Sequence, residues 1–284
     1  MHSFFKRDPE THALGISLWL EKKGIISREK LYRLKRKLIK REHNMYNDAG
    51  EQFFKKIYEH HFYPFLKPGA EILEVGCQYG RFTVDLVEKG HPVMATDIES
   101  HYESFIRQKI KKHPENFSFS TENVLETIYR KFGEKFDAII CLEMIFMVPE
   151  YESVIARFKN LLKPDGVLII SHRTPGYYTY TGLRHNRLED LNAVFSNGPF
   201  KFHFQSAVEL QQLYEQLGYE VLLHKGIGMV SGIIKDHWAA FNDAAQFDEA
   251  RAQYFFDIEM SEKAQQLFKD NGRYQLVIAR PKTS

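Results

Sequence analysis

The sequence contains little cysteine and no long hydrophobic run. Two cysteines among 284 residues exclude a small fold that disulfides hold together. The apolar run 13–20 is only eight residues long, whereas a helix that crosses a bilayer needs about 20. It follows Asp8 and Glu10 rather than a basic leader, and it lacks a small-residue cleavage site. We therefore expect no signal peptide and no transmembrane segment, and a reducing, cytoplasmic location.

A strong excess of one charge is also missing. Lys and Arg number 39 against 37 Asp and Glu, a net charge of +2, so composition does not point to nucleic acid as the main ligand. The basic residues are nevertheless concentrated near the N-terminus, where the predicted helix 28–41 carries eight of them. Such a helix either presents a solvated face or contacts nucleic-acid phosphates or lipid headgroups, and both interpretations stay open.

The pattern along the chain changes near residue 66. Residues 1–66 are predicted to form an N-terminal helical extension, and residues 67–284 a domain with an insert at 174–205. In this domain we expect strands at 72–75, 93–95, 117–119, 138–142, 167–170, 220–223 and 274–279, helices at 81–89, 102–112, 151–162 and 207–217, and irregular chain over 174–206. Runs that are apolar on both faces and joined by helices imply a mainly parallel sheet covered on both sides.

A glycine-containing turn is the most informative motif. Segment 71–81 reads EILEVGCQYGR, so a predicted strand ends near Glu74, and Gly76 and Gly80 bracket a turn that opens a helix. Such a turn brings bare backbone close to a ligand. The second strand ends at Asp97, where a carboxylate can accept hydrogen bonds from both ribose hydroxyls. Order and spacing predict a nucleoside site; the alternative is a tight turn followed by a helix cap.

The sequence does not predict a dinucleotide as the ligand of this site. The fingerprint G-x-G-x-x-G is absent, and Gln78 and Tyr79 fill the middle of the turn with side chains. A pyrophosphate needs several close backbone N–H groups. A ligand without phosphates fits this turn better.

Four ordered motifs make the chain resemble the class I S-adenosylmethionine-dependent methyltransferases. They are E-x-G-x-x-x-G at 74–80, Asp97, FDAIICLE at 136–143 and LKPDGVLII at 162–170. The resemblance runs from about 66 to 174 and resumes at 206–220 and 272–282. It implies a Rossmann-like, doubly wound α/β fold whose seven-stranded sheet is mostly parallel and has an antiparallel last strand, with S-adenosylmethionine as cofactor.

The resemblance also implies roles for individual residues. The methionyl part of the cofactor would be surrounded by Glu74, Gly76, Cys77, Gln78 and Gly80, the ribose bound by Asp97, the adenine by Ile98, Glu122 and Asn123, and the methionine amine flanked by Leu142 and Glu143. Two departures from the family pattern stand out. Gln78 replaces the middle glycine of G-x-G-x-G, and Phe146 and Met147 stand where many relatives carry His.

The acceptor side is less clearly marked. The cofactor's sulfonium makes its methyl group electrophilic, so the protein has to align a nucleophile and exclude water. For a hydroxyl acceptor a base must take the proton, and His172, after the fifth strand, is the candidate; a histidine without chemical function is the alternative. The predicted acceptor walls are Tyr46, Tyr177, Tyr178, Tyr180 and His185, which could equally be ordinary packing. We predict that segments 1–66 and 174–205 close over the acceptor.

These observations predict an S-adenosylmethionine-dependent methyltransferase that acts on a small or medium-sized acceptor. The alternatives are an RNA methyltransferase recruited by the basic helix 28–41 and a scaffold that binds cofactor without turnover. Neither C-x-x-C nor H-x-x-x-H occurs, so we expect no metal site. The sequence leaves open whether oxygen, nitrogen or carbon is methylated, and it leaves the oligomeric state open.

Overall fold

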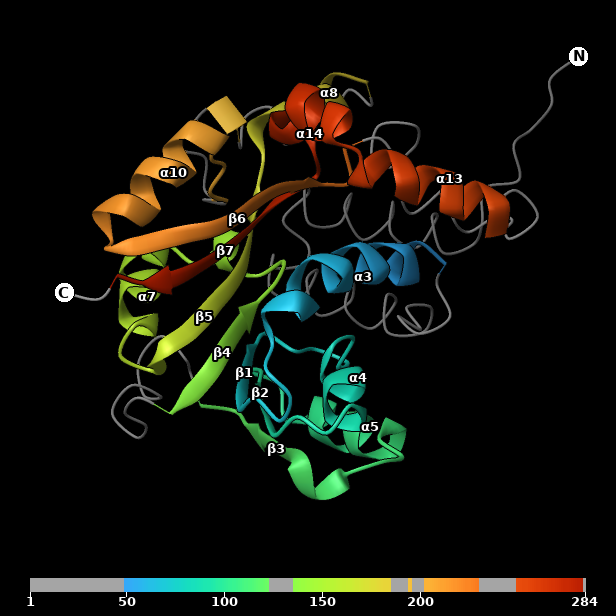
Figure 1. Cartoon of the computed structure of the whole chain (residues 1–284), viewed down its shortest axis with the longest axis vertical. Coiled ribbons are helices and arrows are strands. Elements are labelled where there is room, and N and C mark those ends of the chain that lie inside the picture. The colour runs from blue at the N-terminus through green and yellow to red at the C-terminus, as the bar shows by residue number, and fades with distance from the viewer. Residues whose placement is uncertain (1–48, 123–134, 185–193, 196–201, 230–248, 283–284) are drawn as a thin grey trace, which may run out of the picture. The chain divides into compact units, whose positions relative to one another are not determined.

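A seven-stranded sheet runs through the computed structural model, which describes residues 49–122, 135–184, 194–195, 202–229 and 249–282. The strand order is β3-β2-β1-β4-β5-β7-β6. Every neighbouring pair is parallel except the two pairs that include β7. The predicted doubly wound α/β fold with one antiparallel last strand is therefore confirmed (Figure 1).

The strands lie close to where the hydrophobic runs predict them. Their bounds are β1 Ile72–Val75, β2 Val93–Thr96, β3 Phe117–Ser120, β4 Phe136–Cys141, β5 Leu162–Arg173, β6 Tyr219–Ile227 and β7 Tyr274–Pro281. The main error concerns β5, which begins five residues before the predicted strand 167–170 and ends three residues after it; only its first residue, Leu162, lies in the predicted helix 151–162. The first residues of β5 favour a strand only weakly by their own sequence pattern. They form one because β5 pairs with β4 there, with Phe136 opposite Leu162 and a bulge in the pairing.

The helices flank the sheet. The α-helices are α3 Ala49–Phe62, α4 Thr83–Glu88, α5 His101–Lys109, α7 Tyr151–Phe158, α8 Pro175–Arg184, α10 Ala207–Gln216, α13 Glu249–Met260 and α14 Glu262–Phe268, and the short 3-10 turns are η1 Tyr63–Phe65, η2 Pro114–Asn116, η3 Ile145–Met147 and η4 Lys269–Asn271. Helix α8 lies where irregular chain was expected. Helix α3 falls inside the predicted extension 1–66, yet its residues Ile57, Tyr58 and Phe62 are fully buried and it contacts β6.

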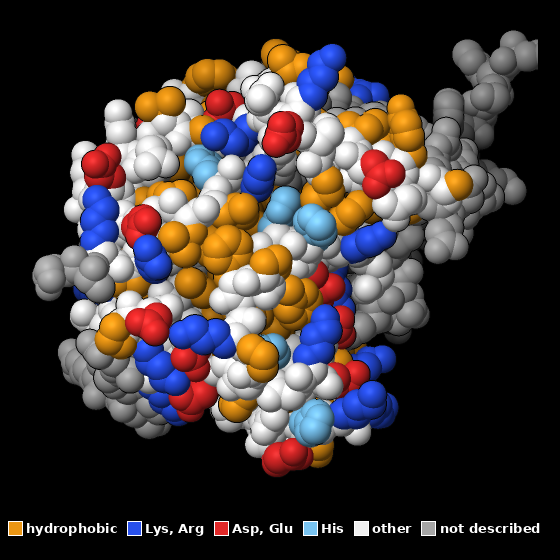
Figure 2. Space-filling view, viewed as in Figure 1, with side chains coloured by type: hydrophobic (Ala, Val, Ile, Leu, Met, Phe, Trp, Pro, Cys, Tyr) orange, Lys and Arg blue, Asp and Glu red, His pale blue; other side chains and the backbone are white. Residues whose placement is uncertain are grey.

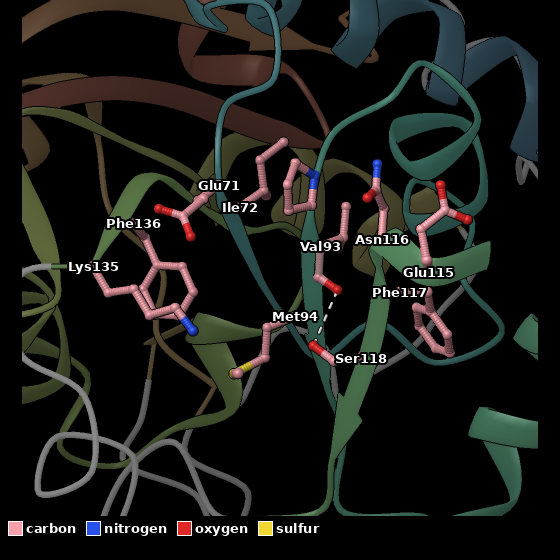
Figure 3. A pocket seen from close by; sticks show the side chains of 11 residues that line it. Glu71, Ile72, Val93, Met94, Glu115, Asn116, Phe117, Ser118, Lys135 and Phe136 are labelled. Carbon is pink, nitrogen blue, oxygen red and sulfur yellow. Dashed lines mark hydrogen bonds between the residues drawn. The ribbon is translucent and has the colours of Figure 1, made fainter. Parts of the chain in front are cut away.

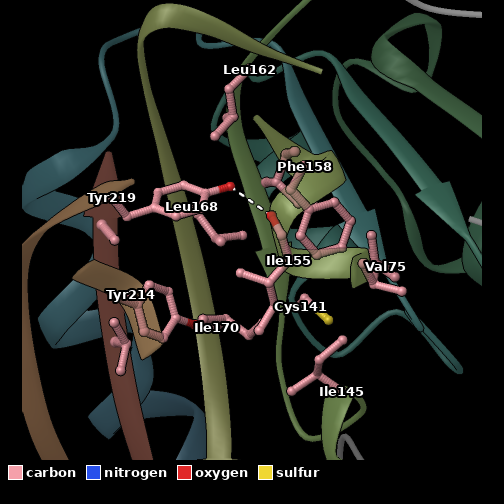
Figure 4. Packing of buried hydrophobic residues seen from close by; sticks show 14 of the residues in the cluster. Val75, Cys141, Ile145, Ile155, Phe158, Leu162, Leu168, Ile170, Tyr214 and Tyr219 are labelled. Carbon is pink, nitrogen blue, oxygen red and sulfur yellow. Dashed lines mark hydrogen bonds between the residues drawn. The ribbon is translucent and has the colours of Figure 1, made fainter. Parts of the chain in front are cut away.

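Helices α7 and α10 cover one face of the sheet, and α3 and α4 lie on the other (Figure 1). Figure 4 shows the core under α7 and α10, where Phe158 and Tyr214 pack against the strands. The Tyr219 hydroxyl donates to the Ile155 carbonyl at 2.8 Å, so this buried polar group has a partner. Full burial of such side chains stabilises the fold by roughly 1.5–3 kcal/mol each.

The end of β5 divides its side chains between the two faces. Successive residues of a strand point to opposite sides. His172 therefore points toward α10, where it contacts Tyr214, while Ser171 and Arg173 point to the opposite side, where Arg173 contacts Tyr178 of α8. This alternation decides which residues can meet at the carboxyl ends of the strands.

On the face shown in Figure 2, hydrophobic side chains gather in the middle, and acidic and basic side chains are interspersed around them. No helix within the described ranges is long and apolar enough to cross a membrane. Nor does any group of three or more His, Cys, Asp or Glu among those residues lie in positions that could hold a metal ion.

Candidate cofactor and acceptor site

The turn after β1 has the backbone conformation that the glycines predict. Gly76 has φ 75° and Gly80 φ 78°, and Gln78 between them has φ 44°. A Cβ on Gly80 would lie 2.7 Å from Ile106 Cγ1 of α5, and one on Gly76 would lie 2.9 Å from Met144 Cγ. The turn is therefore packed tightly on its inner side. Gln78 adopts the left-handed conformation without being glycine, which is a strained state typical of functional turns.

The turn is attached to the end of β2. The backbone N–H groups of Gly76 and Cys77 both donate to the Thr96 carbonyl, at 2.9 and 3.0 Å. The N–H of Gln78 donates to the Asp97 carboxylate at 3.1 Å, and the N–H of Glu99 donates to the same carboxylate at 3.3 Å. Burial raises the pKa of Asp97, and these N–H groups only partly offset it. A carboxylate has about four acceptor positions, and the N–H groups of Gln78, Glu99 and Ile98 all lower the pKa of Asp97 by hydrogen bonding, so Asp97 keeps some acceptor capacity for a ribose hydroxyl.

The Glu74 side chain lies on the buried side of the turn. Its carboxylate is buried and accepts the hydroxyl of Thr83 in α4. Burial raises its pKa to about 7, against the opposing effects of Thr83 and Arg81. Cys77 is buried as well. These two residues shape the turn from inside the protein, while the exposed Gln78 is on its outer side.

The adenine side of the predicted site lies at the ends of β2 and β3. The Ile98 side chain is 73% exposed, an unusual state for a large aliphatic group next to a buried strand end. Ser120 ends β3, where its carbonyl accepts from Asp97 N–H at 3.3 Å and its hydroxyl accepts from Glu122 N–H at 3.2 Å. The structure thus brings Ile98 and Glu122 to the same edge as Asp97.

Glu143, at the end of β4, forms an ion pair that the sequence did not indicate. Its carboxylate lies 2.9 Å from the guanidinium of Arg81, with side chains only 20% and 8% exposed. Its backbone N–H donates to Ser171 Oγ at 2.7 Å, and its φ of 57° is unusual for a non-glycine residue. Leu142 beside it is buried. Arg81 directly follows the glycine motif in the sequence. This position is the signal by which Arg81 could have been predicted as a residue of the site.

His172 does not lie with these residues. It is fully buried beneath α10, and its Nε2 lies 2.9 Å from the Tyr214 hydroxyl. Burial lowers its pKa to about 3, so the ring is neutral. The role of general base stays a prediction for His172, but the ring has no exposed surface in this structure for an acceptor hydroxyl to contact.

The tyrosines of α8 differ in exposure. Tyr177 is buried, Tyr178 is partly buried, and Tyr180 is 43% exposed. Tyr178 is packed against the Arg173 guanidinium, 4.6 Å from its ring centroid, beside Phe204 at 5.2 Å. Tyr178 is therefore a predicted acceptor wall that lies next to a cation at the end of β5.

Several predicted residues lie outside the described part of the chain. They are Tyr46, Asn123, His185 and the basic helix 28–41.

A hollow of about 170 Å³ lies at the other end of the sheet (Figure 3). It is lined by the first residues of β1 to β4, among them Ile72, Val93 and Phe117, and by Lys135. Ligands of open α/β sheets bind at the carboxyl ends of the strands. This hollow is at the amino ends, so it is not the candidate cofactor site.

Comparison with known proteins identifies the class. The family model described as "Methyltransferase domain" matches residues 44–224, which include the glycine turn, Asp97 and Glu143. The chain belongs to this family, and its fold and turn are those of an S-adenosylmethionine-dependent methyltransferase. S-adenosylmethionine is the cofactor of this class of enzyme.

Individual relatives agree with this class. The chain is 30% identical over 106 residues to a ubiquinone biosynthesis O-methyltransferase of Actinobacillus pleuropneumoniae, which covers 36% of this chain and 45% of that protein. The chain thus spans about half the length of the curated relatives it matches.

Two solved structures share the fold. A methyltransferase of Archaeoglobus fulgidus has a TM-score of 0.54 at 16% identity, covering 82% of this chain and 94% of the other. A 1,6-didemethyltoxoflavin-N1-methyltransferase of Burkholderia thailandensis, solved with bound 1,6-didemethyltoxoflavin and S-adenosylhomocysteine, has a TM-score of 0.52 at 17% identity, covering 100% of this chain and 94% of the other.

Proposed function

We propose that this protein transfers the methyl group of S-adenosylmethionine to an oxygen atom of a small-molecule acceptor. The observation that carries the proposal is the Asp97 carboxylate, held opposite the glycine turn by the Gln78 N–H within a chain of the methyltransferase family. The curated relatives are named O-methyltransferases of ubiquinone biosynthesis, which favours oxygen as the acceptor atom and a small molecule as substrate.

The residues present fit the cofactor. Asp97 has acceptor capacity left for a ribose hydroxyl, and exposed Ile98 offers an apolar surface to adenine. Glu143 and the glycine turn flank the position of the methionyl group. When bound, the cofactor supplies a methyl group made electrophilic by its sulfonium. The protein's own contribution is to hold the acceptor oxygen in line with that methyl group and to exclude water.

Calorimetry with S-adenosylhomocysteine tests the cofactor part of the proposal. Asp97→Ala removes a charged acceptor whose hydrogen bonds are each worth roughly 1.5–3 kcal/mol, so affinity should fall at least ~10-fold. The matched control is Asp165→Ala, because Asp165 is an exposed aspartate near the start of β5 whose carboxylate pairs with Lys67 at 3.4 Å. Unchanged affinity in a folded Asp97→Ala protein would contradict the ribose assignment.

Transfer of an isotope-labelled methyl group tests the reaction. The protein is incubated with labelled cofactor and a metabolite extract, and products are identified by mass spectrometry. A labelled small molecule with an O-methyl group is the expected product. Label found only in added RNA would support the nucleic-acid alternative instead, and cofactor binding without any labelled product would support a scaffold.

A further inference from the structure

Three arginines interact electrostatically with the carboxylate of Glu143 at the carboxyl ends of β4 and β5. Arg81 is ion-paired with Glu143 at 2.9 Å. Burial raises the pKa of Glu143, but Arg81, Arg273 and Arg173 lower it, and the net change is downward. Among the residues that the structure describes, no Asp or Glu lies within ion-pair distance of Arg173 or Arg273. The cluster therefore has an excess of positive charge.

Aromatic rings, rather than hydrogen-bond acceptors, surround the guanidinium group of Arg173. Its guanidinium carbon lies 4.0 Å from the ring centroid of Phe146, 4.4 Å from that of Phe202 and 4.6 Å from that of Tyr178. Its Nε has no accessible surface and no hydrogen-bond partner. Ring faces attract the charge, but they do not satisfy the N–H donors, and a buried donor without an acceptor is unfavourable.

Arg273 belongs to the same end of the sheet. It immediately precedes β7, in which Tyr274 pairs with Arg173 across the antiparallel ladder. Its guanidinium carbon lies 5.0 Å from the ring centroid of Tyr274 and 5.5 Å from that of Phe54. Burial opposes the charge of Arg273, but Tyr274, Tyr178 and Glu143 outweigh it and raise its pKa. Tyr178 is thus a neighbour of both arginines.

The cofactor adds no net negative charge to this cluster. It carries one carboxylate against one ammonium and one sulfonium, so its binding adds net positive charge. Charges that are removed from water need partners of opposite sign. In the proposed reaction, the second substrate is the ligand that can add a net negative charge.

We propose that Arg173 and Arg273 form an anion site for a carboxylate of the methyl acceptor, at the carboxyl ends of β5 and β4. This inference rests on the proposed function, because the acceptor is the second ligand of that reaction. A planar guanidinium fork matches a carboxylate with two parallel hydrogen bonds. The rings of Phe146, Tyr178 and Phe202 supply an apolar wall for the body of the acceptor.

Benzoate and its neutral analogue benzamide are the probes. Both are titrated by calorimetry into the full-length protein saturated with S-adenosylhomocysteine. We expect benzoate to bind at least ~10-fold more tightly than benzamide, and Arg173→Gln and Arg273→Gln each to remove most of this preference. Arg173→Lys, which keeps the charge, should retain part of it. Arg280→Gln is the matched control, because Arg280 is an exposed arginine of β7 paired with Glu220.

Equal binding of benzoate and benzamide, or no benzoate binding at millimolar concentration, overturns the anion site. A second arm compares S-adenosylhomocysteine with 5′-methylthioadenosine, which lacks the amino-acid carboxylate. If Arg173→Gln weakens only the former, the arginines bind the cofactor's own carboxylate and the acceptor assignment is wrong. If the wild-type protein does not bind S-adenosylhomocysteine at all, the proposed function fails, and this result is distinct from failure of the anion site. Thermal unfolding of each variant confirms that it is folded.

Discussion

Replacing Glu143 by Gln should destabilise the protein through the positive charges that it leaves behind. The 2.9 Å pair with Arg81 is largely buried, with 20% and 8% of the two side chains exposed. Removing one partner of a buried pair costs about 3–5 kcal/mol. Because Glu143 keeps some exposure, we expect a loss near the lower end, about 3 kcal/mol. For a domain of this size that corresponds to a decrease in Tm of roughly 6–12 °C.

The chain contains a matched control for this experiment. Arg280 and Glu220 form a pair of similar length, 2.7 Å, but their side chains are 51% and 49% exposed. Exposed pairs contribute about 0.2–1 kcal/mol, so Glu220→Gln should change the free energy of unfolding by less than about 1 kcal/mol. Urea unfolding of both variants measures the difference directly.

The pH dependence gives a second readout. The pKa of Glu143 is lowered in the folded protein, so the pair's contribution is present above the ordinary glutamate pKa of roughly 4.3 and decreases as pH falls through the folded value. The difference between wild type and Glu143→Gln should therefore narrow in acid. If Glu143→Gln and Glu220→Gln lose equal stability at neutral pH, burial of the Arg81 pair is not what stabilises this end of the sheet.

Two further predictions concern the turn and the buried imidazole. Gly80→Ala should lose about 1–3 kcal/mol more stability than Gly90→Ala. Both glycines have positive φ, but a Cβ at position 80 would lie 2.7 Å from Ile106, whereas one at position 90 would have no atom within 4 Å. Equal losses in urea unfolding would show that only backbone strain matters. Burial lowers the pKa of His172 to about 3 in the folded protein, whereas an unfolded histidine has a pKa of roughly 6.5. As pH falls below 6.5, protons therefore bind the unfolded chain first, and the folded state loses about 2 kcal/mol of stability by pH 5. His172→Gln should show a correspondingly smaller loss of stability between pH 7.5 and 5. Because the ring is fully buried, we expect this variant to keep its kcat; a large decrease in kcat of the folded variant would support His172 as the general base.

The sheet and the glycine turn after β1 were predictable because both depend on short stretches of chain. The apolar run at 72–75 becomes β1 with the same bounds, since a strand buried on both faces needs only local hydrophobicity. Gly76 and Gly80 bracket a turn as predicted, and the structure shows that both have positive φ, which few other residues adopt without strain. Helix α8 and the first residues of β5 were missed, since their pattern is weak and tertiary pairing determines their conformation.

The charged cluster could not be predicted from the sequence, because it combines residues from distant segments. Arg81 follows β1, Glu143 follows β4, Arg173 ends β5 and Arg273 precedes β7, and the antiparallel pairing of β5 with β7 brings the last two to the same end of the sheet. The alternation of side chains along β5 also separates His172 from Arg173. Sequence alone therefore determined the fold and the glycine turn, and only the tertiary structure decided which charges face each other beside that turn.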